Sequence, residues 1–177
     1  MMYFKPKNGL VGDTIPYYYN SEYHLFYLIA QQDQNDFIKR VSTSWGHFVS
    51  TDILNWKELP IALEPSGKDG SPDKSACWTG SVIEKDGIFN LFYTGGYFDN
   101  VGFRQTICHA HSKDLIHWEK NPINPILTAD ERWYELNDWR DPFVFWDEKE
   151  NVFICLQQPE KNWMEATYRM HSTSEIE

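Results

Sequence analysis

The stretch WTGSVIEKDGIFNLFYT, residues 78–94, recurs in two other places in this chain of 177 residues. Residues 12–28 read GDTIPYYYNSEYHLFYL, and residues 140–156 read RDPFVFWDEKENVFICL. The three stretches align without a gap, at steps of 66 and 62 residues. Internal repeats decide the interpretation of a whole chain, so they come first. Two aligned columns hold Asp13, Thr79 and Asp141, and Phe26, Phe92 and Ile154.

A second shared element follows the first two stretches. Residues 49–60 read VSTDILNWKELP, and residues 110–122 read AHSKDLIHWEKNP, so that Trp56 and Trp118 are 62 residues apart. The third unit ends at MHSTSEIE, near the place where its own tryptophan is expected. Because the two tryptophans recur with the unit, we expect them in its hydrophobic core and outside any functional site.

Each unit has the pattern of about four short β-strands. Aromatic and β-branched runs follow turn residues such as Asn20-Ser21 and Asp86-Gly87, which is typical of strands joined by tight turns. Long helical periodicity is absent, so the sequence predicts an all-β fold. The predicted strands are HLFYLIA, FNLFYTG and VFICLQ, then HFVST and TICHAHS, then WKELPI.

Four-stranded units that repeat near every 60 residues favour the blades of a β-propeller over the coils of a solenoid. A β-sandwich whose strands resemble one another by chance is the alternative. We expect residues 1–177 to form one partial propeller, with blade 1 at about 10–65, blade 2 at about 76–127 and an incomplete blade 3 at about 138–177. A closed ring needs four or more blades, and a partial ring leaves open sheet edges. The chain is therefore expected to be truncated.

Composition narrows the choice of partners. The net charge is −10 and no basic run occurs, which argues against nucleic acid or an anionic membrane surface as a partner. Aromatic residues make up 16% of the chain, which fits both a β-rich fold and flat faces for a ligand. No stretch resembles a signal peptide or a membrane span. The sequence does not indicate an oligomeric state.

The three cysteines, Cys77, Cys108 and Cys155, are odd in number and widely spaced among apolar residues. This pattern favours buried free thiols in a reducing compartment. With no targeting segment recognised, we expect a soluble cytoplasmic protein. Neither a phosphate-binding glycine loop nor a nucleophile–histidine site is evident, and no cofactor is expected.

Four motifs, in this order, resemble the catalytic domain of glycoside hydrolase family 32, the invertase and fructanase family. They are an aspartate after a glycine at 12–13, WGHFVSTDILNW at 45–56, WTGS at 78–81 and WRDPF at 139–143. The resemblance extends from about residue 12 to residue 177. It implies a five-bladed β-propeller, here truncated to about three blades, and a retaining hydrolase acting on β-fructofuranosides such as sucrose or fructans.

The resemblance also implies roles for individual residues. Asp13 matches the nucleophile, and Asp141 matches the aspartate that holds sugar hydroxyls and stabilises the transition state, with Arg140 beside it. The family's third carboxylate, a glutamate acid/base, belongs further along than Glu177, so this fragment is expected to be inactive or nearly so. The positions that match the lining of the sugar subsite are Trp45, Trp78 and Thr79.

Two departures from the family pattern affect the sugar pocket. Residues 12–16 read GDTIP where the family has Asn-Asp-Pro-Asn-Gly, and Leu28 replaces a glutamine. Both changes remove polar groups and leave fructose specificity open. Two other functions remain possible on the same layout: an inverting arabinan or xylan hydrolase with Asp13 as general base, and a carbohydrate-binding propeller without catalysis.

Residues in the same column of successive blades point into one funnel, which would bring Asp13 and Asp141 together across 128 positions. Glycoside hydrolysis needs two carboxyl groups that flank the bond to be cleaved. We expect the Arg140 guanidinium to lower the pKa of Asp141, so that the carboxylate can accept hydrogen bonds from sugar hydroxyls. The plainer alternatives are a turn aspartate at Asp13 and a structural ion pair of Arg140 with Asp141.

Other charged residues are less suggestive. His109 and His111 alternate on one strand face, as two zinc ligands could. No third ligand is evident nearby, and the first unit is expected to lack histidines at the matching positions. We therefore expect packing or surface histidines and no metal. Glu160 and Glu165, the nearest glutamates that follow the third repeat stretch, are expected to be exposed loop charges.

Overall fold

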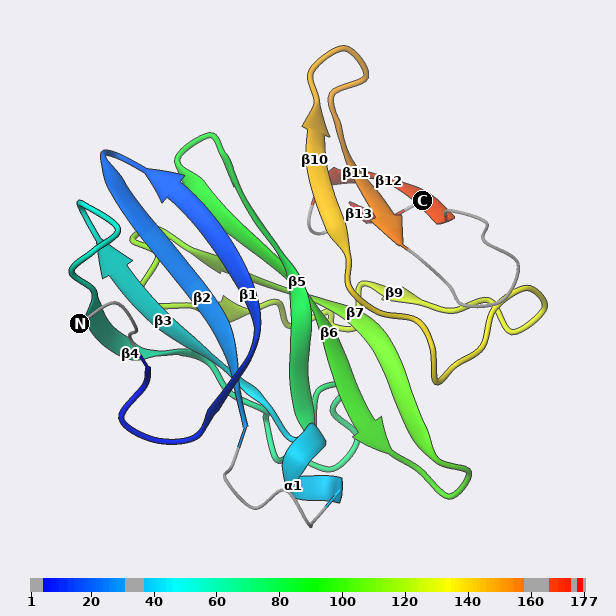
Figure 1. Ribbon diagram of the computed structural model, residues 1–177. Helices are drawn as coiled ribbons and strands as arrows, with labels where there is room; N and C mark the ends of the chain where they lie inside the picture. Colours follow the sequence, from blue (N-terminus) through cyan, green and yellow to red (C-terminus); the bar gives the residue numbers. More distant parts are fainter. Residues whose placement is uncertain (1–4, 31–36, 158–165, 173–174, 177) are drawn as a thin grey trace.

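The computed structural model describes residues 5–30, 37–157, 166–172 and 175–176, and it consists of three antiparallel sheets in chain order (Figure 1). The first sheet contains β1 (Leu10–Tyr19), β2 (Glu22–Ala30), β3 (Ser44–Ser50) and β4 (Lys57–Leu63). The second contains β5 (Ala76–Lys85), β6 (Ile88–Phe98), β7 (Phe103–Ser112), β8 (Glu119–Lys120) and β9 (Leu127–Thr128). The third contains β10 (Phe143–Asp147), β11 (Val152–Gln157), β12 (Ala166–Ser172) and β13 (Glu175–Ile176).

Within each sheet, strands that follow one another in the chain pair antiparallel, except that β9 pairs with β7 beside β8. The predicted strands are confirmed, with ends that differ by a few residues. The predicted turn residues Asn20, Ser21 and Asp86 all have positive φ, a conformation that asparagine and aspartate adopt more readily than most residues. The one helix in the described part of the chain is α1 (Phe37–Val41), and no described helix has the length and apolar character to cross a bilayer.

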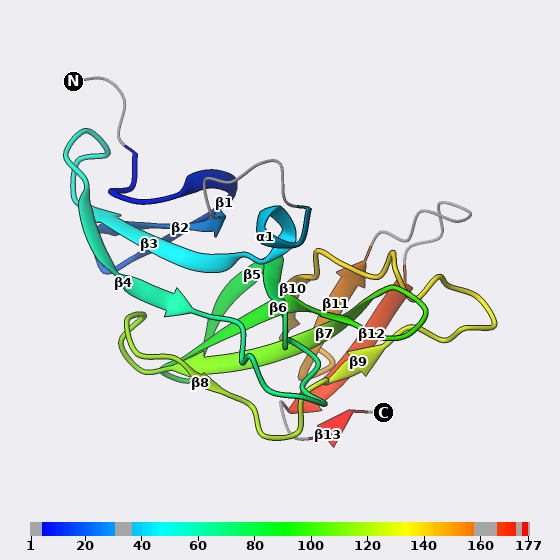
Figure 2. The same ribbon diagram turned by 90° about the horizontal axis from the view of Figure 1, so that it is seen from below.

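The first strands of the three sheets lie side by side. β5 contacts both β1 and β10, so the inner edges of the sheets meet along one line (Figure 1). Seen from below, the sheets fan outward from this line (Figure 2). Residues near the start of β1, of β5 and of the segment before β10 therefore share one region of the molecule.

Two hydrophobic cores join the sheets face to face. Phe26 lies fully buried in the core between the first and second sheets, and Phe92 lies fully buried in the core between the second and third. These two phenylalanines occupy the same column of the repeat, so the same face of each sheet packs against the next one. Trp118 packs partly buried against Phe26, with ring centroids 6.0 Å apart. Trp56 is only partly buried and belongs to neither core, so the expectation of a core position is wrong for this residue.

Buried histidines occupy the matching place in two sheets. The His109 ring lies tilted against Phe92 with centroids 5.0 Å apart, and the His47 ring stacks on Phe26. His47 is therefore the counterpart of His109, contrary to the expectation that the first unit lacks one. His109 is a buried packing residue, whereas His111 is partly exposed, as expected. The three cysteines are buried free thiols, which confirms that prediction.

Candidate active site

Asp13 and Thr79 lie at the same irregularity in two different sheets. The register of β1 against β2 shifts between Val11 and Thr14, and the register of β5 against β6 shifts between Trp78 and Gly80. Such a bulge adds a residue to one strand and re-aims its side chain. The repeated bulge therefore turns both column residues toward the inner edge of their sheets.

Glycine is required at the second of these bulges. A Cβ atom added at Gly80 would lie 1.9 Å from the carbonyl oxygen of Phe92, far inside van der Waals contact. The close approach of β5 to β6 thus depends on the WTGS sequence. This close contact between the two backbones also determines which way the neighbouring Thr79 side chain points.

Asp141 reaches the same region by a different route. It precedes β10 and has a φ of 59°, a left-handed conformation that costs a non-glycine residue on the order of 1–2 kcal/mol. Its backbone N–H donates to Thr94 Oγ1 at 2.8 Å, and that hydroxyl donates to the Thr79 carbonyl at 3.1 Å. The second sheet therefore holds Asp141 in place.

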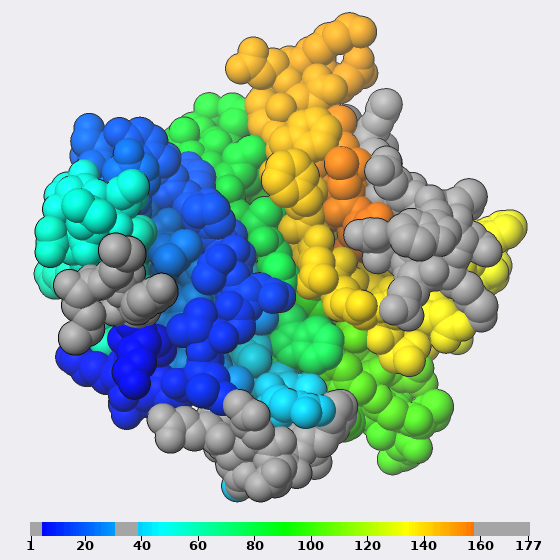
Figure 3. All heavy atoms as spheres, in the orientation of Figure 1, coloured from blue at the N-terminus to red at the C-terminus, as the bar shows by residue number. Residues whose placement is uncertain are grey.

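The three column residues line one cavity of about 280 Å³. The Thr79 hydroxyl donates to Asp13 Oδ2 at 2.5 Å, which links the first sheet to the second. Figure 3 shows the face on which blue β1, green β5 and the yellow-to-orange segment before β10 meet. The cavity is lined by Asp13, Leu28, Arg40, Val41, Thr43, Trp78, Thr79, Arg140 and Asp141.

Electrostatics at Asp141 differ from the sequence-based expectation. Partial burial raises the pKa of Asp141, Arg140 lowers it, and the nearby Asp13 carboxylate raises it further, so that the net pKa is raised. Arg140 Nε lies 3.6 Å from Asp141 Oδ2, while its Nη1 donates to the buried Asp138 carboxylate. Burial is the largest of these effects, and it outweighs the lowering of the pKa by Arg140. Arg140 therefore lowers the pKa of Asp141 as expected, but its effect does not decide the net direction of the shift.

The two tryptophans predicted for the sugar subsite have different places. Trp78 lines the cavity, donates its indole N–H to the Val41 carbonyl at 2.7 Å, and lies against Phe103 with ring centroids 4.9 Å apart. Trp45 is 0% exposed and donates its indole N–H to the Trp78 carbonyl at 3.0 Å. A ring buried on all sides cannot stack on a sugar, so Trp45 supports Trp78 and does not line the cavity.

Sequence reasoning missed the contribution of the segment around α1. Arg40, Val41 and Thr43 line the cavity, and the Thr43 hydroxyl donates to the Cys77 carbonyl at 2.7 Å. The feature of the sequence that could have indicated this segment is the basic residue Arg40 shortly before β3, which lies outside the recognised motifs. Leu28 lies in the lining and is almost fully buried, so the position where the family has glutamine is an apolar wall here.

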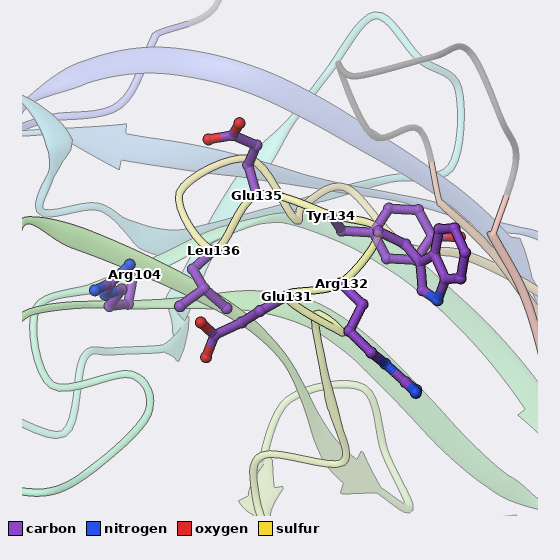
Figure 4. A pocket seen from close by; sticks show the side chains of 7 residues that line it. Arg104, Glu131, Arg132, Tyr134, Glu135 and Leu136 are labelled. Atoms are coloured by element: carbon purple, nitrogen blue, oxygen red, sulfur yellow. The ribbon is translucent and has the colours of Figure 1, made fainter.

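A larger hollow of about 490 Å³ lies between Arg104 and residues 131–136 (Figure 4). Its side chains diverge: Glu135 and Arg132 point to opposite sides of the loop. The guanidinium of Arg104 binds Asp99 at 2.7 Å, and that of Arg132 binds Asp130. The smaller cavity, where two carboxylates face one space, therefore has the chemistry of a candidate site. Among the described residues, no group of three or more histidines, cysteines or acidic residues could hold a metal ion.

Comparison with known proteins identifies the family of the chain. The model of the Glycosyl hydrolases family 32 N-terminal domain matches residues 3–176. The chain belongs to glycosyl hydrolase family 32. Its propeller fold is shared with solved family members, of which this chain covers a part.

Three relatives illustrate the range of the family. A sucrose-6-phosphate hydrolase of Escherichia coli is 33% identical over 147 residues, which cover 78% of this chain and 28% of that protein. A bifunctional fructosyltransferase of Allium cepa, named for its 6(G)-fructosyltransferase and 1-fructosyltransferase activities, is 39% identical over 79% of this chain and 22% of that one. The crystal structure of fructan 1-exohydrolase IIa from Cichorium intybus superposes with a TM-score of 0.78 at 29% identity, over 95% of this chain and 31% of that one.

This family 32 chain thus spans about a quarter of the length of the curated relatives that it matches. The structure brings Asp13, Asp141, Arg140, Trp78 and Thr79 to one cavity and leaves Trp45 behind it. The catalytic and sugar-binding roles of these residues stay predictions. Glu160 and Glu165 lie outside the described residues.

Proposed function

We propose that this family 32 chain carries the nucleophile and the transition-state stabiliser of a glycosidase that cleaves β-fructofuranosides such as sucrose or fructan sugars. The observation that carries the proposal is the shared cavity of Asp13 and Asp141, two carboxylates that are 128 positions apart in the sequence. The relatives named for sucrose-6-phosphate and fructan chemistry support the substrate class.

In the proposed reaction Asp13 is the nucleophile. One oxygen of its carboxylate accepts a hydrogen bond from Thr79, which would leave the other oxygen to face the sugar. That oxygen would bond to the anomeric carbon while the bond from this carbon to the leaving oxygen breaks, giving a covalent glycosyl-enzyme that water then hydrolyses. Retention of configuration follows from the two displacements.

Asp141 would bind the sugar hydroxyls. Its carboxylate accepts hydrogen bonds that strengthen as positive charge develops on the ring, but only in the ionised form. Because its pKa is raised, sugar binding should weaken at a higher pH than for an ordinary aspartate as the solution is acidified. The acid/base is proposed to come from a third carboxylate, which is not among the described residues of the cavity wall.

An activated fructosyl donor tests Asp13 without the acid/base. β-Fructofuranosyl fluoride has a leaving group that needs little protonation, so the nucleophile can react alone. We expect intact-mass spectrometry of the 177-residue chain to show a single added fructosyl group, and peptide mapping to place it on Asp13. Without an acid/base to activate water, the adduct should persist.

The matched control is Asp86→Asn, which removes another exposed aspartate at a distant hairpin turn. Asp13→Asn should abolish the adduct, and Asp86→Asn should leave it unchanged. An adduct that forms equally in Asp13→Asn would contradict the proposal. Turnover with inverted product and no adduct would instead identify an inverting enzyme with Asp13 as general base, and sugar binding without either reaction would identify a binding module.

A further inference from the structure

Two hydroxyl groups of the second sheet hold the segment that carries Asp141. The Thr94 hydroxyl on β6 accepts a hydrogen bond from the backbone N–H of Asp141 at 2.8 Å. The Ser81 hydroxyl on β5 accepts one from the backbone N–H of Val144 at 3.0 Å. Both residues are buried, with Thr94 0% exposed and Ser81 8% exposed. The start of the third sheet is thus attached to side chains of the second.

The repeat shows that the fold of a single sheet does not require these hydroxyls. Both lie in columns that are apolar in the other two units. The aligned residues are Leu28 and Leu156 for Thr94, and Ile15 and Phe143 for Ser81. The first and third sheets therefore form with apolar side chains at both places. The unit that has hydroxyls there is the second sheet, whose β5 contacts both β1 and β10 (Figure 1).

The Thr94 hydroxyl also leads to the opposite side of the cavity. It donates to the Thr79 carbonyl at 3.1 Å, and the Thr79 hydroxyl donates to Asp13 Oδ2 at 2.5 Å. Thr79 is the extra residue of the bulge in β5, and such a residue is left unpaired in the strand ladder. Thr94 and Thr79 together form a continuous link between the two carboxylate residues of the cavity.

We propose that Thr94 and Ser81 are positioning residues, whose hydroxyls fix the Asp141 segment on the second sheet and thereby place Asp141 relative to Asp13. Neither hydroxyl residue lines the cavity, so both act through Asp141. This inference rests on the proposed function, because it concerns the same two carboxylates. It adds two residues that the proposed reaction does not itself use.

Burial makes the position of Asp141 depend on the hydroxyl of Thr94. Because Thr94 is fully buried, water cannot take the place of a lost hydroxyl, and the N–H that it binds would lose its partner. The residue that carries this N–H has a φ of 59°, a conformation that persists only where the surrounding structure holds it. Without the hydroxyl, the Asp141 backbone relaxes and its carboxylate moves away from its place beside Asp13.

NMR titration of the aspartate carboxyl carbons in the 177-residue chain tests the proposal without a substrate. Burial raises the pKa of Asp141, so release of the segment toward solvent should lower this pKa. Thr94→Val, which replaces the hydroxyl by a methyl group, should therefore lower the titration midpoint of Asp141, and Thr94→Ser should restore it. Thr106→Val is the matched control, since Thr106 is a buried threonine of β7 whose hydroxyl lies 3.5 Å from the Gly95 carbonyl.

The reaction with β-fructofuranosyl fluoride gives a second readout. Displacement of Asp141 in Thr94→Val should slow formation of the Asp13 adduct at least about tenfold, because a small misplacement of a group that acts on the transition state has a large effect on rate. Thr94→Ser should react at a rate near that of the wild type. A wild-type chain that forms no adduct would contradict the proposed function alone, and the NMR midpoints would still decide the positioning role.

Ser81→Ala provides an independent variant that removes less of the core. It releases the Val144 N–H and should shift the Asp141 midpoint in the same direction as Thr94→Val, with far-UV circular dichroism showing that each variant is folded. Wild-type midpoints in the folded variants would overturn the proposal. So would a midpoint in Thr94→Ser as low as in Thr94→Val, or an equal shift in Thr106→Val, because packing and not the hydroxyl would then place Asp141.

Discussion

The turns at residues 50–56 and 112–118 have the same sequence pattern and the same local hydrogen bonds, but very different surroundings. In each, an aspartate accepts hydrogen bonds from two backbone N–H groups that follow it, and the tryptophan donates its indole N–H to a carbonyl three residues earlier at 3.0 Å. A hydrogen bond from the Asn55 side chain, followed by those from the backbone N–H groups, lowers the pKa of Asp52, and the His117 side chain and backbone do the same for Asp114. The motif alone therefore determines the shape of the turn.

Burial separates the two turns. Leu115 is 2% exposed in the core between the first and second sheets, while Ile53, its counterpart, is 57% exposed. Trp118 packs on Phe26 of the preceding sheet, and Trp56 has no preceding sheet among the described residues. The comparison teaches that the motif builds the turn and that a neighbouring sheet determines how much the turn stabilises the fold.

The largest expected difference concerns the two aliphatic residues. Leu115→Ala should lower the free energy of unfolding by about 2–5 kcal/mol, because it leaves a cavity in a closed core. Ile53→Ala should change that free energy by less than about 0.5 kcal/mol, because the Ile53 side chain is exposed. Urea unfolding measures the free energy of unfolding of each variant. Equal losses of this free energy would show that Ile53 is also buried in solution.

Acidification should destabilise the fold through the buried histidines at matching positions of the first and second sheets. Burial, together with the neighbouring histidine in each case, lowers the pKa of His47 and of His109 to about 3, from an ordinary value of 6.5. The unfolded chain therefore binds more protons as the pH falls below 6.5, and the folded state loses about 1.4 kcal/mol per pH unit for each histidine. This loss should level off near the folded-state value.

Unfolding measured between pH 6.5 and about 5 tests this slope in a range where few carboxylates titrate. His109→Gln keeps a polar side chain beside Asn90, whose Oδ1 lies 3.1 Å from His109 Nε2, and should remove the part of the slope due to His109. His47 and the buried His24, whose pKa is also lowered, should keep the rest. An unchanged slope would mean that His109 is not buried in the neutral form.

A smaller difference is expected between the two tryptophans. Phenylalanine at either position removes the indole N–H bond to the carbonyl, worth about 1 kcal/mol. Trp118→Phe should cost a further amount of about 0.5–1.5 kcal/mol from poorer packing on Phe26, a contact that Trp56 lacks. In thermal unfolding, Trp118→Phe should therefore have a lower Tm than Trp56→Phe. The reverse order would contradict the packing difference.

The smallest expected difference is between the two capping aspartates. Asp52→Ala and Asp114→Ala remove the same local hydrogen bonds and should lower Tm by the same small amount. Differential scanning calorimetry can compare them, with Asp86→Asn as an exposed control. A clearly larger effect at Asp114 would show that the neighbouring sheet also strengthens the local turn.

Much of the fold could be predicted because the repeat is a recurring pattern of side-chain types in the sequence. Alternating apolar residues and turn residues recur at fixed steps, and strand pairing between chain neighbours follows from short turns. The column that holds Asp13, Thr79 and Asp141 also predicted their meeting, since residues at equivalent places in repeated sheets face the same edge. The direction of the Asp141 pKa shift could not be predicted, because it depends first on how far tertiary packing buries the carboxyl group.

The sequence by itself determined the repeat, the strands, the turns and the family to which the chain belongs, because each depends on residues that are near neighbours or lie at a constant spacing. Only the tertiary structure decided that Trp45 is buried behind Trp78, that the segment around Arg40 completes the cavity wall, and that one of two matching turns is buried. Those outcomes depend on which sheet lies against which, and burial between sheets is a property of surfaces brought together from distant parts of the chain.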